Sequence, residues 1–183
     1  RDYLEKLAIF VRWLLAHEYD VRLLIGDVLY DPPALQDFRD LLKQHASTSD
    51  EGHIIDEPAV SVEHLLSQLA STDIVIGTRF HNVLLSLILT KPVISISFHH
   101  KCASLMNQMG LSQYCQDIHR LDVDRLIRQF SDLENSVEEV RALIEQKTEE
   151  FRRALDEQYA VIFDNDPMPA TGRLDETLRW RAT

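Results

Sequence analysis

The residues best suited to chemistry lie in two short segments, each directly after an apolar run. The first segment, residues 78–81 (TRFH), follows the run at residues 73–77 (DIVIG). Arg79 carries a planar guanidinium that matches a carboxylate or a phosphate, and His81 can change protonation near neutral pH. If a strand ends at Gly77 and a helix begins next, the exposed amides and the helix dipole also favour an anion. The segment therefore predicts a site for a small anion.

The second segment, residues 98–101 (FHHK), follows the apolar run at residues 93–97 and adds a further cation, Lys101. If the two runs are neighbouring parallel strands joined by a right-handed crossover, both segments open on the same edge of the sheet. Ligands of parallel α/β proteins bind beyond the carboxyl ends of the strands. Arg79, His81 and Lys101 then face one ligand. From spacing alone, a surface ion pair for Arg79 and a helix cap for His81 stay open as structural alternatives.

Short strands that alternate with helices must position these segments. Apolar periodicity predicts helices over residues 2–17, 32–45, 62–69, 81–89 and 101–109, with Ser61 as a cap and Gly110 as a stop. Short apolar runs predict strands over residues 21–26, 53–56, 73–77 and 93–97. Such alternation implies an α/β fold with a parallel sheet covered on both faces, a three-layer Rossmann-like domain.

The domain organisation expected is one Rossmann-like domain and a tail. The domain spans residues 1–163 and ends in a long, charged, solvated helix over residues 136–163. Residues 164–183 are expected to be irregular, apart from a helix near 174–180. A doubly wound domain normally opens on a central strand, whereas this chain opens on a helix. We therefore expect residues upstream of Arg1 to supply the first strand of the sheet.

The motifs around these segments resemble one family. In order along residues 61–111, the chain carries a small-residue turn at Gly77, an Arg-hydrophobic-His triplet, a strand entered through Pro92, and Lys101 before a helix ending in Gly110-Leu111. This combination resembles the polysaccharide pyruvyl transferase family. Before Ser61 and after Leu121 the likeness is one of architecture.

The resemblance implies both an architecture and a reaction. It implies a two-domain enzyme similar to the type-B glycosyltransferases, with this chain as the second, donor-binding domain. It also implies transfer of the pyruvyl group of phosphoenolpyruvate to two hydroxyls of a sugar, in a polysaccharide or its precursor. The product is a cyclic ketal, and phosphate is released. Phosphoenolpyruvate is the donor substrate, and no cofactor is expected.

The triplet of the family contacts phosphoenolpyruvate, which carries over to Arg79, Phe80 and His81, and the matching lysine is Lys101. Arg79 and the amides of Phe80 and His81 suit a phosphate or carboxylate, with Thr78 beside them. Either His81 or Lys101 is the general acid that protonates the methylene carbon.

Further polar residues lie near the predicted site. His99 and His100 adjoin the site and can contact the acceptor, a glycan or a lipid-linked sugar. Because neighbouring side chains at a strand exit point to opposite sides, at most one of the two is expected there. Asp27 and Asp31 follow the strand expected over residues 21–26, and each is expected to cap a helix or form a turn before Pro32 more often than to line the site.

Composition narrows the classes of protein. A net charge of −11 with 30 acidic residues argues against a general nucleic-acid binder. No apolar stretch reaches the length of a membrane span, and no spacing of His, Cys and carboxylate residues indicates a metal site. Cys102 and Cys115 are expected to be free thiols in a reducing, cytoplasmic setting.

Two other functions stay open. A nucleotide-sugar glycosyltransferase or epimerase would use the same helix N-terminus for a diphosphate. It is disfavoured because no acidic residue suited to a ribose follows the helix expected at residues 81–89. A non-catalytic binding or assembly domain is the second alternative, with the long charged helix as its interface.

Overall fold

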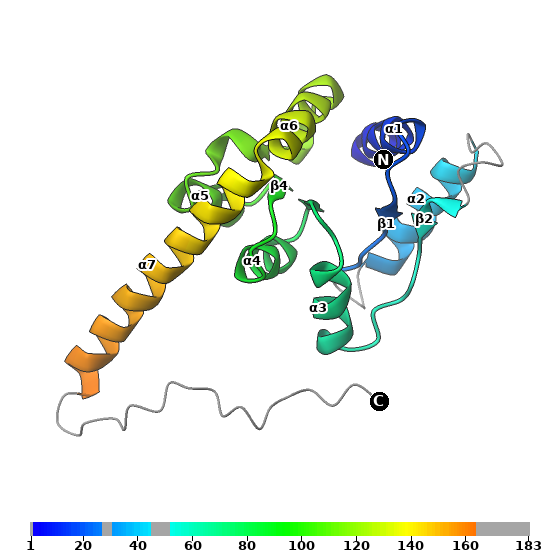
Figure 1. Cartoon of the computed structure of the whole chain (residues 1–183). Helices are drawn as coiled ribbons and strands as arrows, with labels where there is room; N and C mark the ends of the chain where they lie inside the picture. Colours follow the sequence, from blue (N-terminus) through cyan, green and yellow to red (C-terminus); the bar gives the residue numbers. More distant parts are fainter. Residues whose placement is uncertain (1, 27–30, 45–51, 164–183) are drawn as a thin grey trace. The chain divides into compact units, whose positions relative to one another are not determined.

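The computed structural model describes residues 2–26, 31–44 and 52–163 (Figure 1). The contacts of the chain divide it into two units, residues 1–147 and residues 148–183. The strands and the candidate site lie in the first unit. Asp27, the tail and its expected helix near residues 174–180 lie outside the described residues.

Helices and short strands alternate along the chain, as the sequence predicts (Figure 1). The strands are β1 (Val21–Arg22), β2 (Ile54–Ile55), β3 (Val75–Gly77), β4 (Val93–Ile96) and β5 (Cys115–Gln116). The α-helices are α1 (Asp2–Ala16), α2 (Asp31–Lys43), α3 (Val62–Ala70), α4 (Phe80–Ile88), α5 (His100–Gln108), α6 (Val123–Asn135) and α7 (Val137–Phe163), and short 3-10 helices cover Ser112–Tyr114 and Ile118–Arg120.

All strand pairs among the described residues are parallel, and they form two separate ladders. β1 pairs with β2, with Val21 opposite Ile54. β4 lies between β3 and β5, with Ser95 opposite both Gly77 and Cys115. Within the described residues no strand links β1 to β3. The chain is therefore an α/β protein with parallel strands, arranged as two ladders.

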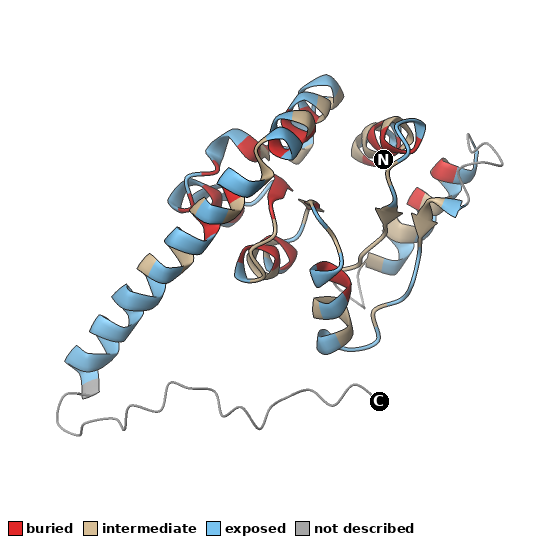
Figure 2. Ribbon diagram, in the orientation of Figure 1, coloured by how far each residue is buried: buried red, intermediate tan, exposed pale blue. Residues whose placement is uncertain are grey.

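Two apolar clusters hold the first unit together. The larger cluster surrounds β4, whose four residues are all buried, and includes side chains from six α-helices, among them Phe10, Val83, Met106, Phe130 and Ile144. The smaller cluster packs α1 against α2. Figure 2 shows these buried positions in red and the far part of α7 in pale blue, where residues 151–162 are all exposed. The predicted long solvated helix is confirmed.

Local signals in the sequence set most element boundaries. The Ser61 hydroxyl accepts a hydrogen bond from the His64 N–H at 3.1 Å, so the predicted cap of α3 is confirmed. Gly110 follows α5 with a φ of +74°, a backbone conformation that glycine adopts without strain. The strand expected over residues 21–26 is shorter, since only Val21 and Arg22 form the regular ladder. β5 was missed because it is two residues long and half polar.

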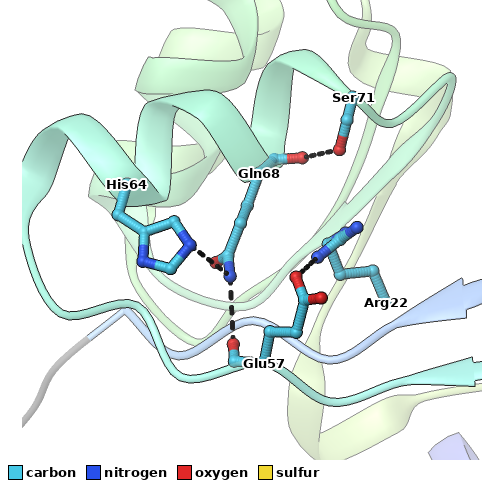
Figure 3. A network of polar contacts seen from close by, with 5 residues as sticks. All are labelled: Arg22, Glu57, His64, Gln68 and Ser71. Carbon is cyan, nitrogen blue, oxygen red and sulfur yellow. Dashed lines mark hydrogen bonds and ion pairs between the residues drawn. The ribbon is translucent and has the colours of Figure 1, made fainter. Parts of the chain in front are cut away.

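Glu57, the second residue after β2, connects α3 to β1 through polar contacts (Figure 3). Arg22 on β1 donates to the carboxylate of Glu57 at 2.7 Å. The side-chain amide of Gln68 on α3 donates to the backbone carbonyl of Glu57 at 3.0 Å. Glu57 thus connects α3 to β1 through its side chain and its backbone carbonyl.

Candidate anion site at the ends of β3 and β4

The first loop of the site is the tight connection from β3 to α4. Arg79 is the N-cap residue of α4 and has an extended backbone, so the helix begins at Phe80. A Cβ on Gly77 would lie 2.7 Å from a methyl group of Val83, which explains the glycine: it lets α4 pack closely on the end of β3. The N–H groups of the first turn of α4, which have no partner within the helix, are therefore presented at the strand end.

The second loop connects β4 to α5. His99 is the N-cap residue of α5, and its ring nitrogen Nδ1 accepts a hydrogen bond from the Lys101 N–H at 3.2 Å. The His99 N–H in turn donates to the Ser97 hydroxyl at 3.0 Å. Because Gly77 pairs with Ser95 in parallel register, both loops leave the same edge of the ladder. The predicted juxtaposition of the two segments is confirmed at the level of the backbone.

Arg79 is held by a carboxylate from a third element. Its Nε donates to Asp31 Oδ1 at 3.1 Å, and its Nη2 forms an ion pair with the same oxygen. Asp31 Oδ2 accepts the N–H of Gly26 at 2.9 Å. Asp31 thus has the turn role expected from sequence and also orients Arg79, a role that the sequence did not indicate because the two residues are 48 positions apart.

Tyr3 and Asn82 lie near the pair formed by Arg79 and Asp31, and the sequence did not indicate either of them as a site residue. Burial, and to a lesser extent the negative charge of Asp31, raise the pKa of Tyr3, while the positive charge of Arg79 lowers it. Asn82 is 8% exposed, and its Oδ1 has no hydrogen-bond partner among the described residues. A Cβ on Gly26 would lie 2.9 Å from Cγ of Arg79 and 3.0 Å from the Asn82 amide, so glycine is required for this close approach.

The other predicted site residues lie at the same edge. Thr78 is half-buried, and Phe80 contacts His81 edge to face, with ring centroids 5.7 Å apart. His81 and Lys101 are exposed, His81 in the first turn of α4 and Lys101 in the first turn of α5.

The prediction that His99 and His100 point to opposite sides is wrong. Their rings stack, with centroids 4.7 Å apart and an interplanar angle of 29°. The alternation of a strand ends at Ile96, and His100 already belongs to α5, so the rule for strands does not apply to this pair.

Two absences apply to the part of the chain that the structure describes. No group of three or more His, Cys, Asp and Glu residues there is arranged to hold a metal ion. No helix there is both long and apolar enough to cross a membrane.

The fold and this edge define a parallel α/β protein whose strand ends carry two cationic residues beside two helix N-termini. A family model described as polysaccharide pyruvyl transferase matches residues 1–100, more than half of the chain, and the chain belongs to this family. The match also covers α1, β1, α2 and β2, a region in which the sequence resembled the family only in its architecture.

A distant curated relative agrees with this assignment. The amylovoran biosynthesis protein AmsJ of Erwinia amylovora is 27% identical over 84 residues, which are 46% of this chain. The matched segment is 20% of the length of that relative. No solved structure matches the chain significantly.

Proposed function

We propose that this chain is the donor-binding part of an enzyme that transfers a pyruvyl group from phosphoenolpyruvate to two hydroxyls of one sugar. The sugar belongs to a polysaccharide or to its lipid-linked precursor, the product is a cyclic pyruvate ketal, and phosphate is released. The observation that carries the proposal is the parallel register of β3 and β4, which brings the loops with Arg79, His81 and Lys101 to one edge. The fold proposed for the complete domain is Rossmann-like, in a two-domain architecture similar to the type-B glycosyltransferases.

Phosphoenolpyruvate is a compact anion with a carboxylate and a phosphate, and the edge offers a donor for each. A guanidinium carries five N–H donors, and the contact with Asp31 uses those on Nε and Nη2. Asp31 thereby fixes the plane of the Arg79 fork. The amides of Phe80 and His81 and the positive end of the α4 dipole add attraction at the same place. In this proposal Arg79 binds one anionic group and Lys101 the other.

The reaction needs an acid close to the methylene carbon of the donor. Protonation of this carbon turns the methylene into a methyl group and leaves positive charge on the neighbouring carbon, C2, which the first sugar hydroxyl attacks. Cleavage of the bond between C2 and the phosphate oxygen then releases phosphate, and the second hydroxyl attacks C2. Each hydroxyl gives up its proton, so the sum is phosphoenolpyruvate plus a diol yielding a ketal plus phosphate.

His81 is the first candidate for this acid because it is exposed at the strand end and an imidazole exchanges protons near neutral pH. Lys101 is the alternative acid if His81 only binds the donor. His99 and His100 form a stacked pair at the end of β4, a surface suited to the acceptor sugar.

The test is the replacement His81→Gln in the complete enzyme, with turnover measured on phosphoenolpyruvate and its glycan acceptor. Loss of a general acid lowers turnover by about a hundredfold or more. The matched control is His17→Gln, since the exposed His17 ring forms its hydrogen bond with the Trp13 carbonyl of α1. An unchanged rate in His81→Gln, with a large loss in Lys101→Met, would reassign the acid to Lys101. If both variants keep the wild-type rate, the proposed catalytic edge is wrong.

A further inference from the structure

The loop that follows β5 lies beside the loop that follows β4. Cys115 pairs with Ser95 in parallel register, as Gly77 does on the other side of β4, so the carboxyl ends of β3, β4 and β5 meet at one edge. The backbone N–H of Ser97 donates to the Gln116 carbonyl at 3.0 Å, which joins the loop after β4 to the loop after β5. The proposed donor site uses the loops after β3 and β4, and the loop after β5 has no role in it.

A row of aromatic rings spans the loops after β4 and β5. The Phe98 ring contacts the rings of His99 and His119, whose centroids lie 6.2 Å and 6.5 Å from its own. The His100 ring stacks on that of His99 and extends the row. Phe98 is 69% exposed, and the three histidines are exposed as well. An open phenyl ring with imidazoles around it therefore lies at the end of the sheet.

Hydrogen bonds fix the backbone that carries this row. The Ser97 hydroxyl accepts the N–H of His99 at 3.0 Å, and Oδ1 of Asp117 accepts that of His119 at 2.8 Å. The side chain of Gln116, at the end of β5, is buried and hydrogen-bonded through both its amide nitrogen and its oxygen. The residues of the row are thus positioned before a ligand arrives, which reduces the entropy lost on binding.

The surroundings of Phe98 indicate what kind of ligand covers it. Single exposed apolar side chains are common, but Phe98 lies at the edge where parallel α/β proteins bind their ligands. Protein partners cover contiguous apolar patches of several hundred Å², and one phenyl ring among imidazoles is much smaller. A pyranose ring matches it in size and chemistry. Its C–H groups can pack on the phenyl face, and its hydroxyls can bond to imidazole nitrogens.

We infer that Phe98 is the platform on which a sugar ring of the acceptor stacks, with His99 and His119 as partners of its hydroxyls. The acceptor role rests on the proposed function, whereas the binding of a sugar can be tested without it. The donor then occupies the loops after β3 and β4, and the sugar occupies the loops after β4 and β5. The two substrates therefore lie side by side along one edge of the sheet.

Saturation-transfer difference NMR on the complete protein tests whether Phe98 binds a sugar. The probe is methyl β-D-galactopyranoside, whose C–H groups at C3, C4 and C5 form one apolar face, and the methyl glycosides of glucose and mannose are titrated in the same way. The inference predicts the strongest transfer to the hydrogens of that apolar face. In Phe98→Ala the apparent Kd should rise about tenfold, as it does when a stacking ring is removed. No transfer to any of the three sugars, or an unchanged Kd in Phe98→Ala, would overturn the inference.

Further variants separate stacking from general apolar contact. Phe98→Leu keeps an apolar side chain without a ring and should bind as weakly as Phe98→Ala, whereas Phe98→Tyr keeps the ring and should restore binding. His119→Ala should raise the Kd about threefold through loss of a hydrogen bond. Ile88→Ala is the matched control, because Ile88 is 57% exposed at the last residue of α4, and it should bind like the wild type. Full affinity in Phe98→Leu, or equal losses in Ile88→Ala and Phe98→Ala, would contradict a stacking platform.

The exposure of Phe98 makes these variants suitable for the test. Substitutions at exposed positions change stability by no more than about 0.5 kcal/mol, so all of them should fold like the wild type. Circular dichroism checks this.

Turnover of the complete enzyme separates this inference from the proposed function. Phe98→Ala should raise the KM for the glycan acceptor about tenfold and leave phosphoenolpyruvate binding unchanged, whereas Arg79→Ala should weaken phosphoenolpyruvate binding. Sugar binding that depends on Phe98, in a protein that binds no phosphoenolpyruvate, would support the platform and refute the proposed function. Pyruvyl transfer with an unchanged acceptor KM in Phe98→Ala would refute the platform alone. Saturation of the base of UDP through Phe98, with no transfer to the sugars, would also refute it and favour a nucleotide-sugar enzyme.

Discussion

The contact between Arg79 and Asp31 determines how an anion meets the strand ends. An arginine after a strand is often a plain surface residue, and the sequence left this alternative open. In the structure, Asp31 holds Arg79 at the exit of β3 and is itself fixed by the N–H of Gly26. Arg79 is thus placed and oriented before any ligand arrives. The energetic benefit for binding is that little side-chain freedom remains to be lost.

Cys115 carries a prediction about pH. Burial raises the pKa of its thiol from 9.0 to about 11, with a smaller contribution from Cys102. The thiol therefore remains neutral at pH 8, where the thiolate fraction is about a hundredfold below that of a thiol with pKa 9. Iodoacetamide should alkylate Cys115 about a hundredfold more slowly than free cysteine at pH 8, as measured by mass spectrometry.

The same shift affects stability. Because the folded pKa lies above the unfolded value, the contribution of Cys115 to stability is complete below pH 9 and is lost as the pH rises toward 11. The variant Cys115→Ser lacks this dependence and serves as the control. Alkylation of Cys115 in the native protein at the rate of free cysteine would contradict the account.

At the scale of elements, the sequence predicted what depends on local spacing. The stripes of apolar residues gave the helices to within a few residues, and Ser61 and Gly110 marked boundaries through capping and backbone conformation. Contacts between distant segments could not be predicted from the sequence. The Asp31 partner of Arg79 and the stacked rings of His99 and His100 depend on how separate elements pack. β5 is held by pairing with β4 rather than by an apolar run of its own.

The junction of β3 and α4 gives a prediction about packing. In Gly77→Ala, the new Cβ would lie 2.7 Å from a methyl group of Val83, which is fully buried and has little room to move. Overpacking of this kind costs about 1–3 kcal/mol, which urea denaturation can measure.

Gly52→Ala is the matched control for this substitution. Apart from its chain neighbours, no described residue has an atom within 4 Å of the position that its Cβ would take, so the expected change is within about 0.5 kcal/mol. Equal stability of the two variants would show that α4 does not pack on β3 as described.

At the scale of the molecule, α7 passes from a packed to a solvated environment. Ile144 is fully buried in the larger apolar cluster, whereas Leu155, in the second unit, is 49% exposed. Ile144→Ala should therefore lower the free energy of unfolding by about 2–5 kcal/mol. Leu155→Ala changes the same helix and should stay within about 0.5 kcal/mol. A comparable loss in both variants, measured by urea denaturation, would contradict the exposure described for the far part of α7.

The central claim is that the edge formed by β3 and β4 binds phosphoenolpyruvate through Arg79. Calorimetric titration of the complete enzyme with phosphoenolpyruvate, and separately with a nucleotide sugar, tests it most directly. The account predicts binding of phosphoenolpyruvate alone, with affinity reduced at least about tenfold in Arg79→Ala, since a hydrogen bond to a charged group contributes about 1.5–3 kcal/mol. Arg153→Ala removes an exposed charge from α7 and should bind like the wild type. Binding of the nucleotide sugar in place of phosphoenolpyruvate, or full affinity for phosphoenolpyruvate in Arg79→Ala, would contradict the account.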